Sequence, residues 1–459
     1  MSDHGVFSPG WAGTGVDDLV SAAEFVRAML AVETALARAQ AKFGVIPATA
    51  AEAIAAVTAD AIDIDALAEG VRATANPVVS FVAQLGSAVD PDAAEYVHRG
   101  CTSQDVLDSA LMLLCRRVLT RIVDDLVRCA DALAALAARH RDTVQVGRTL
   151  TQHAVPVTFG LKVATWLNLV LDALARCRAA RDSTPASLGG AAGTLSAYAE
   201  YATLAGAAQG GGVELMDAFA AELDLRAPLV PWHSVRTPIV DVASALAFVG
   251  GALGKFAIDV QVLARTEIAE VVEPAAPSRG ASSTMPQKHN PVLATLIVTS
   301  ARQLPSYTGI LYASMMSEDE RSAGGWHAEW QPLRECLRLA AGAAANAAEL
   351  AEGLTALPDR MRDNLALTGS AVVSERLNTV LAPMIGKVAA KALLTEVADA
   401  AAKSGDDLVV LLCQGLRQRG HSVTEADLGQ YASPDHYLGA APVLVDRTLQ
   451  RHQAERSAL

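Results

Sequence analysis

Residues 280–291 read GASSTMPQKHNP and lie between two long stretches that are rich in helix-forming residues. This segment, called the signature loop below, combines small residues with paired serines, a lysine and an asparagine, so it has little to offer a hydrophobic core. Small residues let the backbone approach a ligand closely. Lys288 and nearby backbone N–H groups can hold an anion, and Ser282 or Ser283 can exchange a proton. A plain connector does not need these residues at fixed spacing, so we interpret the loop as functional.

The composition favours helices. The chain has 459 residues, which is long enough for two or three domains. Hydrophobic residues make up 51% and aromatic residues only 4%, with alanine dominant, whereas strands prefer β-branched and aromatic residues. The formal net charge is −13 and no basic run appears, so we expect neither nucleic acid nor a membrane surface as a partner. An anionic substrate must therefore be captured by local positive groups.

Several motifs are missing from the sequence. The six cysteines show no C-x-x-C pair or zinc-ligand spacing, so we expect free thiols and a reducing cytoplasm. The N-terminus does not resemble a signal peptide, and no uninterrupted apolar run reaches the roughly 20 residues of a membrane span. No P-loop, dinucleotide fingerprint, H-E-x-x-H or G-x-S-x-G motif occurs. The sequence therefore predicts no metal and no organic cofactor.

Apolar residues recur at spacings of three and four over long stretches, which is typical of amphipathic helices. An N-terminal helical domain is predicted over 1–100, with helices near 22–44, 48–57, 63–71 and 77–87. Five longer helices are predicted at 103–141, 156–182, 238–271, 291–316 and about 329–352. Helices of 25–35 residues span roughly 38–52 Å and must pack on each other or on another subunit. We therefore predict a central bundle over 101–352 and, after a break at Gly353 and Pro358, a helical C-terminal domain over 353–459.

Two polar segments between these helices are candidates for substrate binding. In the first, residues 98–105, Thr102 or Ser103 can cap a helix and Asp105 suits its positive end, but capping leaves three polar side chains without a role: His98, Arg99 and Gln104. The second, residues 147–156, offers donors for a carboxylate just before a predicted helix start: Arg148, Thr149, Gln152 and His153. The alternative for His153 is a solvated loop histidine.

Two further segments fit packing as well as function. Residues 231–236, PWHSVR, place a histidine and an arginine beside a tryptophan, which also describes a cation–π packing corner. Residues 324–330, GGWHAEW, follow Arg321 and hold two of the five tryptophans. We interpret this second segment as architecture or specificity rather than catalysis.

The signature loop resembles the S-S-x-M-P-x-K-x-N motif of the fumarase/aspartase superfamily, and TSQDVLDSALML and GRTLTQHAVPVT resemble the two other regions that form active sites in that superfamily. The resemblance implies an all-α, three-domain fold whose central long-helix bundle assembles into a tetramer core. It also implies a homotetramer in which each active site takes the three regions from three subunits.

The implied chemistry is removal of a proton next to a carboxylate and expulsion of a leaving group from the neighbouring carbon. Concentrated hydrogen bonds must stabilise the negative charge that develops, and a serine is a poor base unless its anion is stabilised. The implied catalytic residues are Ser282 as base, Lys288 and His153. The residues expected to bind a small anionic polycarboxylate are His98, Arg99, Thr102, Ser103, Gln104, Arg148, Thr149, Gln152, Ser283, Met285, Asn290 and Arg321.

Four stretches (GGAAGT, PWHSVR, GGWHAEW and YLGAAPVLVDRTL) resemble bacterial 3-carboxy-cis,cis-muconate cycloisomerases, which makes that lactone-forming reaction the first expectation. Leu150 departs from the pattern, because fumarases and adenylosuccinate lyases have histidine there and cycloisomerases usually have tryptophan. A leucine can neither donate a proton nor bind a carboxylate. Leu150 therefore favours, as the first alternative, a fumarate-releasing lyase with a good leaving group, such as nitrosuccinate lyase. It weakens adenylosuccinate lyase, which is expected to use the histidine and ranks below, and the last alternative is an inactive structural homologue.

Overall fold

The computed structural model describes residues 5–277, 279–281 and 284–457, so Ser282 and Ser283 lie outside the described residues. Nearly all regular structure is helical, which confirms the all-α prediction. By its internal contacts the chain divides into two compact units. Unit 1 holds the chain up to Val127, Asp172–Gly254 and Thr295–Ala347, and unit 2 holds Arg128–Leu171, Lys255–Ala294 and the chain from Ala348 onward. The three-domain division stays a prediction.

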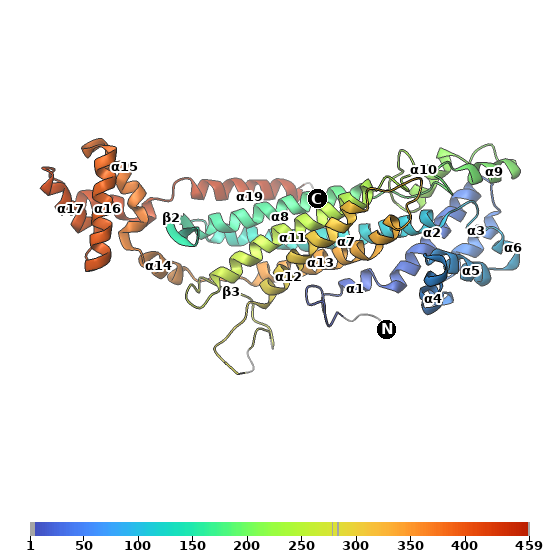
Figure 1. Cartoon of the computed structure of the whole chain (residues 1–459), viewed down its shortest axis with the longest axis horizontal. Coiled ribbons are helices and arrows are strands. Elements are labelled where there is room, and N and C mark those ends of the chain that lie inside the picture. The colour runs from blue at the N-terminus through green and yellow to red at the C-terminus, as the bar shows by residue number, and fades with distance from the viewer. Residues whose placement is uncertain (1–4, 278, 282–283, 458–459) are drawn as a thin grey trace. The chain divides into compact units, whose positions relative to one another are not determined.

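Five long helices contribute residues to both units and correspond to the five long helices predicted. They are α7 (Ser103–Arg139), α8 (Phe159–Asp182), α11 (Thr237–Leu263), α12 (Val292–Ala313) and α13 (Gly325–Gly353). Within unit 1, α11 and α12 approach closely, because a Cβ on Gly250 would lie only 2.5 Å from Leu304 Cδ1. Also within unit 1, Thr308 Oγ1 of α12 and Cys336 Sγ of α13 lie 3.8 Å apart. Figure 1 shows these helices running alongside one another.

Other helices, all but α2 of them short, complete unit 1. They are α1 (Val16–Leu19), α2 (Ala22–Lys42), α3 (Ala48–Ala55), η1 (Ala59–Ala61), α4 (Ile64–Thr74), α5 (Val78–Ala88), α6 (Pro91–Ala94), α9 (Ser196–Leu204) and α10 (Val213–Glu222). Four of them, α2, α3, α4 and α5, correspond to the helices predicted near 22–44, 48–57, 63–71 and 77–87, and α2 shows why. Ser21 caps it by accepting from the Glu24 backbone N–H, its apolar face is buried, and it ends at Lys42, two residues before a glycine with φ of 72°.

Unit 2 contains the C-terminal helices (Figure 1), and all of them except the last two in the chain contribute residues to a core of leucines and valines. They are α14 (Pro358–Ala366), η2 (Gly369–Val373), α15 (Ser374–Ile385), α16 (Lys387–Ser404), α17 (Leu408–Gln418), α18 (Glu425–Ala432), η3 (Pro434–His436) and α19 (Ala441–Ser457). Two small antiparallel sheets also belong to this unit: β1 (Val144–Thr149) with β2 (Gln152–Thr158), and β3 (Val271–Val272) with β4 (Thr355–Ala356).

The hairpin of β1 and β2 corrects one sequence-based expectation. Residues 147–156 were expected to be a loop and Pro156 a helix start, but the chain forms a strand to Thr158 and α8 begins at Phe159. Alternating β-branched residues explain the difference, because Val144 and Val146 turn one face of β1 into the core. The polar residues of this segment therefore project from a hairpin rather than from the start of a helix.

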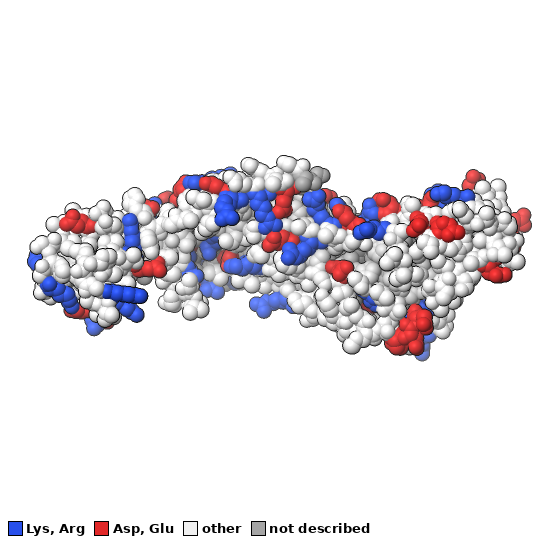
Figure 2. Space-filling view, turned by 90° about the horizontal axis from the view of Figure 1, so that it is seen from above, with Lys and Arg blue, Asp and Glu red and all other residues white. Residues whose placement is uncertain are grey.

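Helix α11 also ends earlier than the predicted 271. It stops at Leu263, whose carbonyl accepts the Glu270 N–H, after Ala269 adopts a left-handed conformation with φ of 50°. By length and composition α11 could cross a membrane, but 67% of its most apolar window is buried, as in the core helix of a globular protein. On the face seen in Figure 2, basic and acidic side chains are interleaved with uncharged surface.

Candidate active site

Three of the predicted substrate-binding residues meet at the start of α7. Arg321 donates from Nε to Gln104 Oε1 (2.8 Å) and from Nη2 to Thr102 Oγ1 (3.1 Å) and to the Ala191 carbonyl (3.2 Å). Among the residues that the structure describes, Arg321 Nη1 has no hydrogen-bond partner. A guanidinium held in this way can offer its remaining N–H groups to a carboxylate.

A buried ionic cluster fixes the orientation of Gln104. Its Nε2 donates to Asp108 Oδ2 (3.1 Å) and to the His233 carbonyl (2.9 Å), which leaves Oε1 as the acceptor for Arg321. Asp108 in turn pairs with Arg236, whose side chain is only 1% exposed and also pairs with Glu329. Because buried charges are costly unless they are paired, this cluster is a rigid support for Gln104.

Asp105 is a buried hub. It accepts hydrogen bonds from the backbone N–H groups of Gly189 (2.8 Å) and Gly190 (3.0 Å), the Tyr198 hydroxyl (3.0 Å) and His233 Nε2 (2.7 Å). Burial, together with the charge of Asp105, raises the pKa of Tyr198 well above its usual value, so the phenol stays a donor. Asp105 was expected only to suit the positive end of a helix. It also connects the start of α7 to residues 189–194, GGAAGT, and to the PWHSVR segment.

His98 and Arg99 have quite different surroundings. His98 Nδ1 lies 2.6 Å from Glu33 Oε1, while the His98 backbone N–H donates to Glu33 Oε2 (3.1 Å). The Arg99 guanidinium instead lies over the rings of Tyr96 (4.8 Å) and Tyr201 (4.4 Å). Ser103, the first residue of α7, is partly buried. Arg99 thus packs on tyrosines, whereas His98 is held by a carboxylate.

In unit 2, Arg148 is engaged by a fully buried carboxylate. Its Nη1 and Nη2 donate to Glu270 at 3.1 and 2.7 Å, and Gln145 Nε2 (2.5 Å) and Asn364 Nδ2 (2.8 Å) donate to the same carboxylate. Glu270 thereby anchors the β1–β2 hairpin, which presents two exposed candidates at its turn, Thr149 and Gln152.

The turn of this hairpin is strained. Leu150 and Thr151 adopt φ values of 49° and 71°, although neither is glycine, and Leu150 is 95% exposed. Beyond the turn, His153 Nδ1 shares a hydrogen bond of 2.9 Å with Thr368 Oγ1. Burial and the neighbouring Arg148 lower the pKa of His153, which favours a neutral imidazole.

The signature loop is closed at its base by a short antiparallel stem. Ala281 bridges His289, and the backbone N–H and side-chain Nδ2 of Asn290 both donate to the Gly280 carbonyl, at 3.0 and 3.3 Å. The Lys288 N–H donates to the carbonyl of Met285 (3.0 Å). Lys288 and Met285 are exposed on this loop. Asn290 thus closes the stem, while Ser282 and Ser283 lie outside the described residues.

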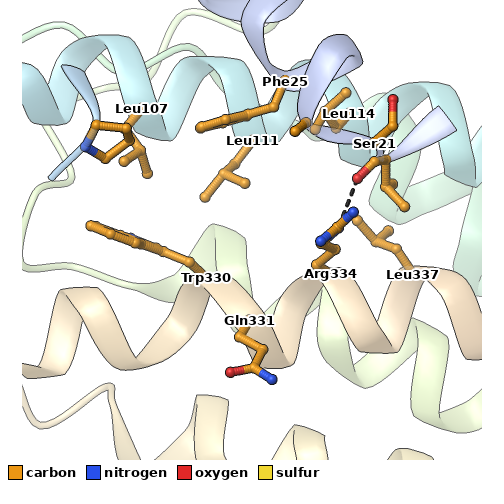
Figure 3. A pocket seen from close by; sticks show the side chains of 12 residues that line it. Ser21, Phe25, Leu107, Leu111, Leu114, Trp330, Gln331, Arg334 and Leu337 are labelled. Atoms are coloured by element: carbon orange, nitrogen blue, oxygen red, sulfur yellow. Dashed lines mark hydrogen bonds between the residues drawn. The ribbon is translucent and has the colours of Figure 1, made fainter. Parts of the chain in front are cut away.

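A cavity of about 300 Å³ in unit 1 is a separate feature (Figure 3). Its walls are mainly apolar side chains of α2, α7 and α13, including Phe25, Leu107, Leu111 and Trp330. Arg334 borders it but donates from Nε to the Val20 carbonyl (2.7 Å). None of the predicted site residues lines this cavity.

Comparison with known proteins supports the resemblance. The sequence model of a family described as Lyase matches residues 18–305. A nitrosuccinate lyase of Streptomyces davaonensis is 53% identical over 97% of this chain and 94% of its own length. The chain belongs to the fumarase/aspartase superfamily. As a member of this superfamily it is an enzyme, and its reaction class is that of the superfamily's lyases.

Other members of the superfamily match over nearly the whole chain. A 3-carboxy-cis,cis-muconate cycloisomerase of Pseudomonas aeruginosa is 42% identical over 94% of this chain and 92% of its own. The crystal structure of 3-carboxy-cis,cis-muconate lactonizing enzyme from Pseudomonas putida matches with a TM-score of 0.89 at 36% identity, covering 98% and 99% of the two chains. The superfamily's all-α fold is thus confirmed for this chain.

Sequence reasoning missed the carboxylates that support the site. Glu33, Asp108 and Glu329 look like ordinary members of helical stretches, and no local pattern indicates that they are buried. One signal was available in PWHSVR, whose cation–π interpretation is confirmed by Arg236 over Trp232 at 4.9 Å. Packing also accounts for GGWHAEW, because its two tryptophan rings meet edge to face at 5.0 Å.

Proposed function

We propose that this enzyme is a nitrosuccinate lyase, which eliminates nitrite from nitrosuccinate and releases fumarate. The observation that carries the proposal is the 53% identity to the nitrosuccinate lyase over 97% of the chain, against 42% for the cycloisomerase. The exposed Leu150 supports it, because this side chain offers no proton to a leaving group. Nitrite is a weak base and leaves without such help.

In the proposed reaction, Ser282 removes a proton from the carbon next to one carboxylate, which becomes a doubly negative aci-carboxylate. The electron pair then forms the carbon–carbon double bond, and nitrite departs with the electrons of the C–N bond. Lys288 and the backbone N–H groups of the signature loop would stabilise the developing charge. Closure of the loop would exclude water.

The other substrate carboxylate would be bound near the start of α7. Arg321 supports this role, because two of its nitrogens are held by Gln104 and Thr102 while Nη1 remains for a ligand. His98 would add a second donor there, and we propose that His153, Thr149 and Gln152 contribute to the site from the hairpin of a different subunit, as the resemblance to the superfamily implies. We further propose a homotetramer with active sites shared between subunits, located in the cytoplasm, where the free cysteines would stay reduced.

A cycloisomerase acting on 3-carboxy-cis,cis-muconate is the second candidate. The TM-score of 0.89 with the Pseudomonas putida enzyme favours it, as do the four sequence stretches that resemble that branch. It would use the same proton abstraction, but with a carboxylate of the substrate itself as the group that leaves or adds.

The deciding experiment incubates the purified protein separately with nitrosuccinate, 3-carboxymuconate and adenylosuccinate. We expect nitrite and fumarate in equal amounts from nitrosuccinate, and loss of both products in Ser282→Ala. Ser404→Ala, an equivalent change at the exposed end of α16, is the matched control and should keep full activity. Consumption of the muconate diene from 3-carboxymuconate, with no nitrite released from nitrosuccinate, would show that the enzyme is a cycloisomerase. Turnover of none of the three substrates would favour an inactive homologue. Near-normal kcat in Ser282→Ala would remove the assigned base.

A further inference from the structure

The carboxylate of Glu33 reaches His98 at two points, although the two residues are 65 positions apart. Glu33 lies in the middle of α2 and is only 2% exposed. One oxygen accepts from Nδ1 of the imidazole at 2.6 Å and the other accepts from the His98 backbone N–H at 3.1 Å. A buried carboxylate with this geometry specifies both the ring nitrogen that carries a proton and the path of the main chain.

The backbone conformation of His98 indicates that this contact is maintained at a cost. His98 has φ of 56°, in the left-handed region that residues with a side chain rarely adopt. Such strain persists only where surrounding contacts over-determine it, and it is concentrated at functional sites. The bond from the His98 N–H to Glu33 is one such contact. A second contact is the hydrogen bond from the Cys101 N–H to the His98 carbonyl (3.1 Å), which closes the turn that follows His98.

We propose that Glu33 is a positioning residue of the active site, which holds His98 as an imidazolium with Nε2–H free to donate to an oxygen of the anionic substrate. This inference rests on the proposed function for the charge of the substrate. Glu33 would not touch the substrate itself and would act only through His98. The same arrangement serves an elimination of nitrite and a lactone-forming reaction, since both substrates carry carboxylates.

The groups around His98 agree with a cationic imidazole. Burial lowers the pKa of His98, but the hydrogen bond and charge of Glu33, with a smaller contribution from Asp105 of α7, raise it above its usual value overall. Burial and Asp105 raise the pKa of Cys101 well above its usual value, so this neighbouring thiol stays neutral. The Tyr198 phenol of α9 also stays neutral. Glu33 is therefore the anion in direct contact with the imidazole.

The test compares Glu33→Gln with the parent enzyme, because the substitution keeps the size of the side chain and removes its charge. Loss of a contacting carboxylate should lower the pKa of His98 by about one unit or more. Since the cation is the form that binds the substrate, kcat/KM falls as pH rises through this pKa. In Glu33→Gln, the fall of kcat/KM on the alkaline side of the pH profile should therefore move to lower pH by the same amount. KM should be affected more than kcat. Glu33→Asp keeps the charge and should return the pKa of His98 most of the way to its value in the parent enzyme.

Glu24→Gln is the matched control, because Glu24 lies on the same helix and pairs with Arg27 and Arg117 instead of a histidine. It should leave both the pH profile and the His98 titration unchanged. The titration is followed by NMR on protein labelled with ¹³C-histidine, with His98→Gln identifying the resonance, so it requires no turnover. An unchanged His98 pKa in folded Glu33→Gln would overturn the proposal. If that variant does not fold, a His98 pKa below about 6.5 in the parent protein would do the same.

Discussion

Arg148 and Glu270 form a two-point ion pair, with Nη2–Oε1 and Nη1–Oε2 distances of 2.7 and 3.1 Å. The glutamate side chain is 0% exposed and the arginine 15%. Arg148 was expected to bind a substrate carboxylate, yet a carboxylate of the protein already occupies its fork. Arg148 therefore pairs with Glu270 rather than offering its charge to a substrate, and this pair holds the hairpin in position.

Glu270→Gln should destabilise the protein strongly. The change leaves a largely buried guanidinium without its anion, and breaking a buried pair in this way typically costs about 3–5 kcal/mol. The free energy of unfolding in denaturant measures the effect. Glu352→Gln is the matched control, because the Glu352–Arg128 pair is about half exposed on both sides and should contribute no more than ~1 kcal/mol. Equal losses in the two variants would contradict the structural role of Glu270.

His153 should make stability depend on pH in the acid range. Burial and Arg148 lower its pKa in the folded protein, whereas a histidine in the unfolded chain titrates near about 6.5. The unfolded chain then binds the proton first, so the stability present above that pH is lost as pH falls toward the folded pKa. His153→Gln should flatten the slope of unfolding free energy against pH below about 6.5. An identical slope in parent and variant would show that His153 is not responsible.

Gly280→Ala should impair the signature loop without unfolding the protein. Gly280 has φ of 68°, and a Cβ there would lie 2.6 Å from the Asn290 carbonyl oxygen, so the stem cannot close as it does now. If opening the stem costs about 1–3 kcal/mol, kcat/KM should fall by roughly 5- to 150-fold. Gly420→Ala controls for strain alone, because its φ is 83° and nothing lies within 4 Å of the added Cβ. It should keep its kcat/KM.

Leu150→Gly should stabilise the hairpin and reduce activity. Glycine relieves the left-handed strain at φ of 49°, which is worth about 1 kcal/mol or more. The lost leucine is the apolar group that the turn presents, so we expect a higher KM. Thermal unfolding and steady-state kinetics measure the two effects. Ala75→Gly relieves similar strain at φ of 59° at the end of α4 and should stabilise without changing KM. Full activity in Leu150→Gly would mean that the leucine has no part in the site.

Much of the fold could be predicted, because helix periodicity and termini are local properties. Gly44 follows the end of α2, and the break predicted at Gly353 and Pro358 is where α13 ends and α14 begins. The β1–β2 hairpin could not be predicted in the same way, since its strands are short and its polar turn resembles a loop. The early end of α11 was also hidden, because it depends on Glu270 turning toward Gln145 and Arg148. These errors fall where a distant contact overrides the local preference.

The amino-acid sequence alone determines the high helix content, the long apolar helix faces and the residues of the signature loop, because each of these depends only on residues close together in the chain. The packing of the helices adds the partners of the polar residues. Glu33 meets His98, Asp105 meets His233, and Arg236 joins Asp108 to Glu329 across separations of 65 to 128 positions. No local pattern encodes such pairs, since burial and charge neutralisation depend on which helix faces come together in three dimensions.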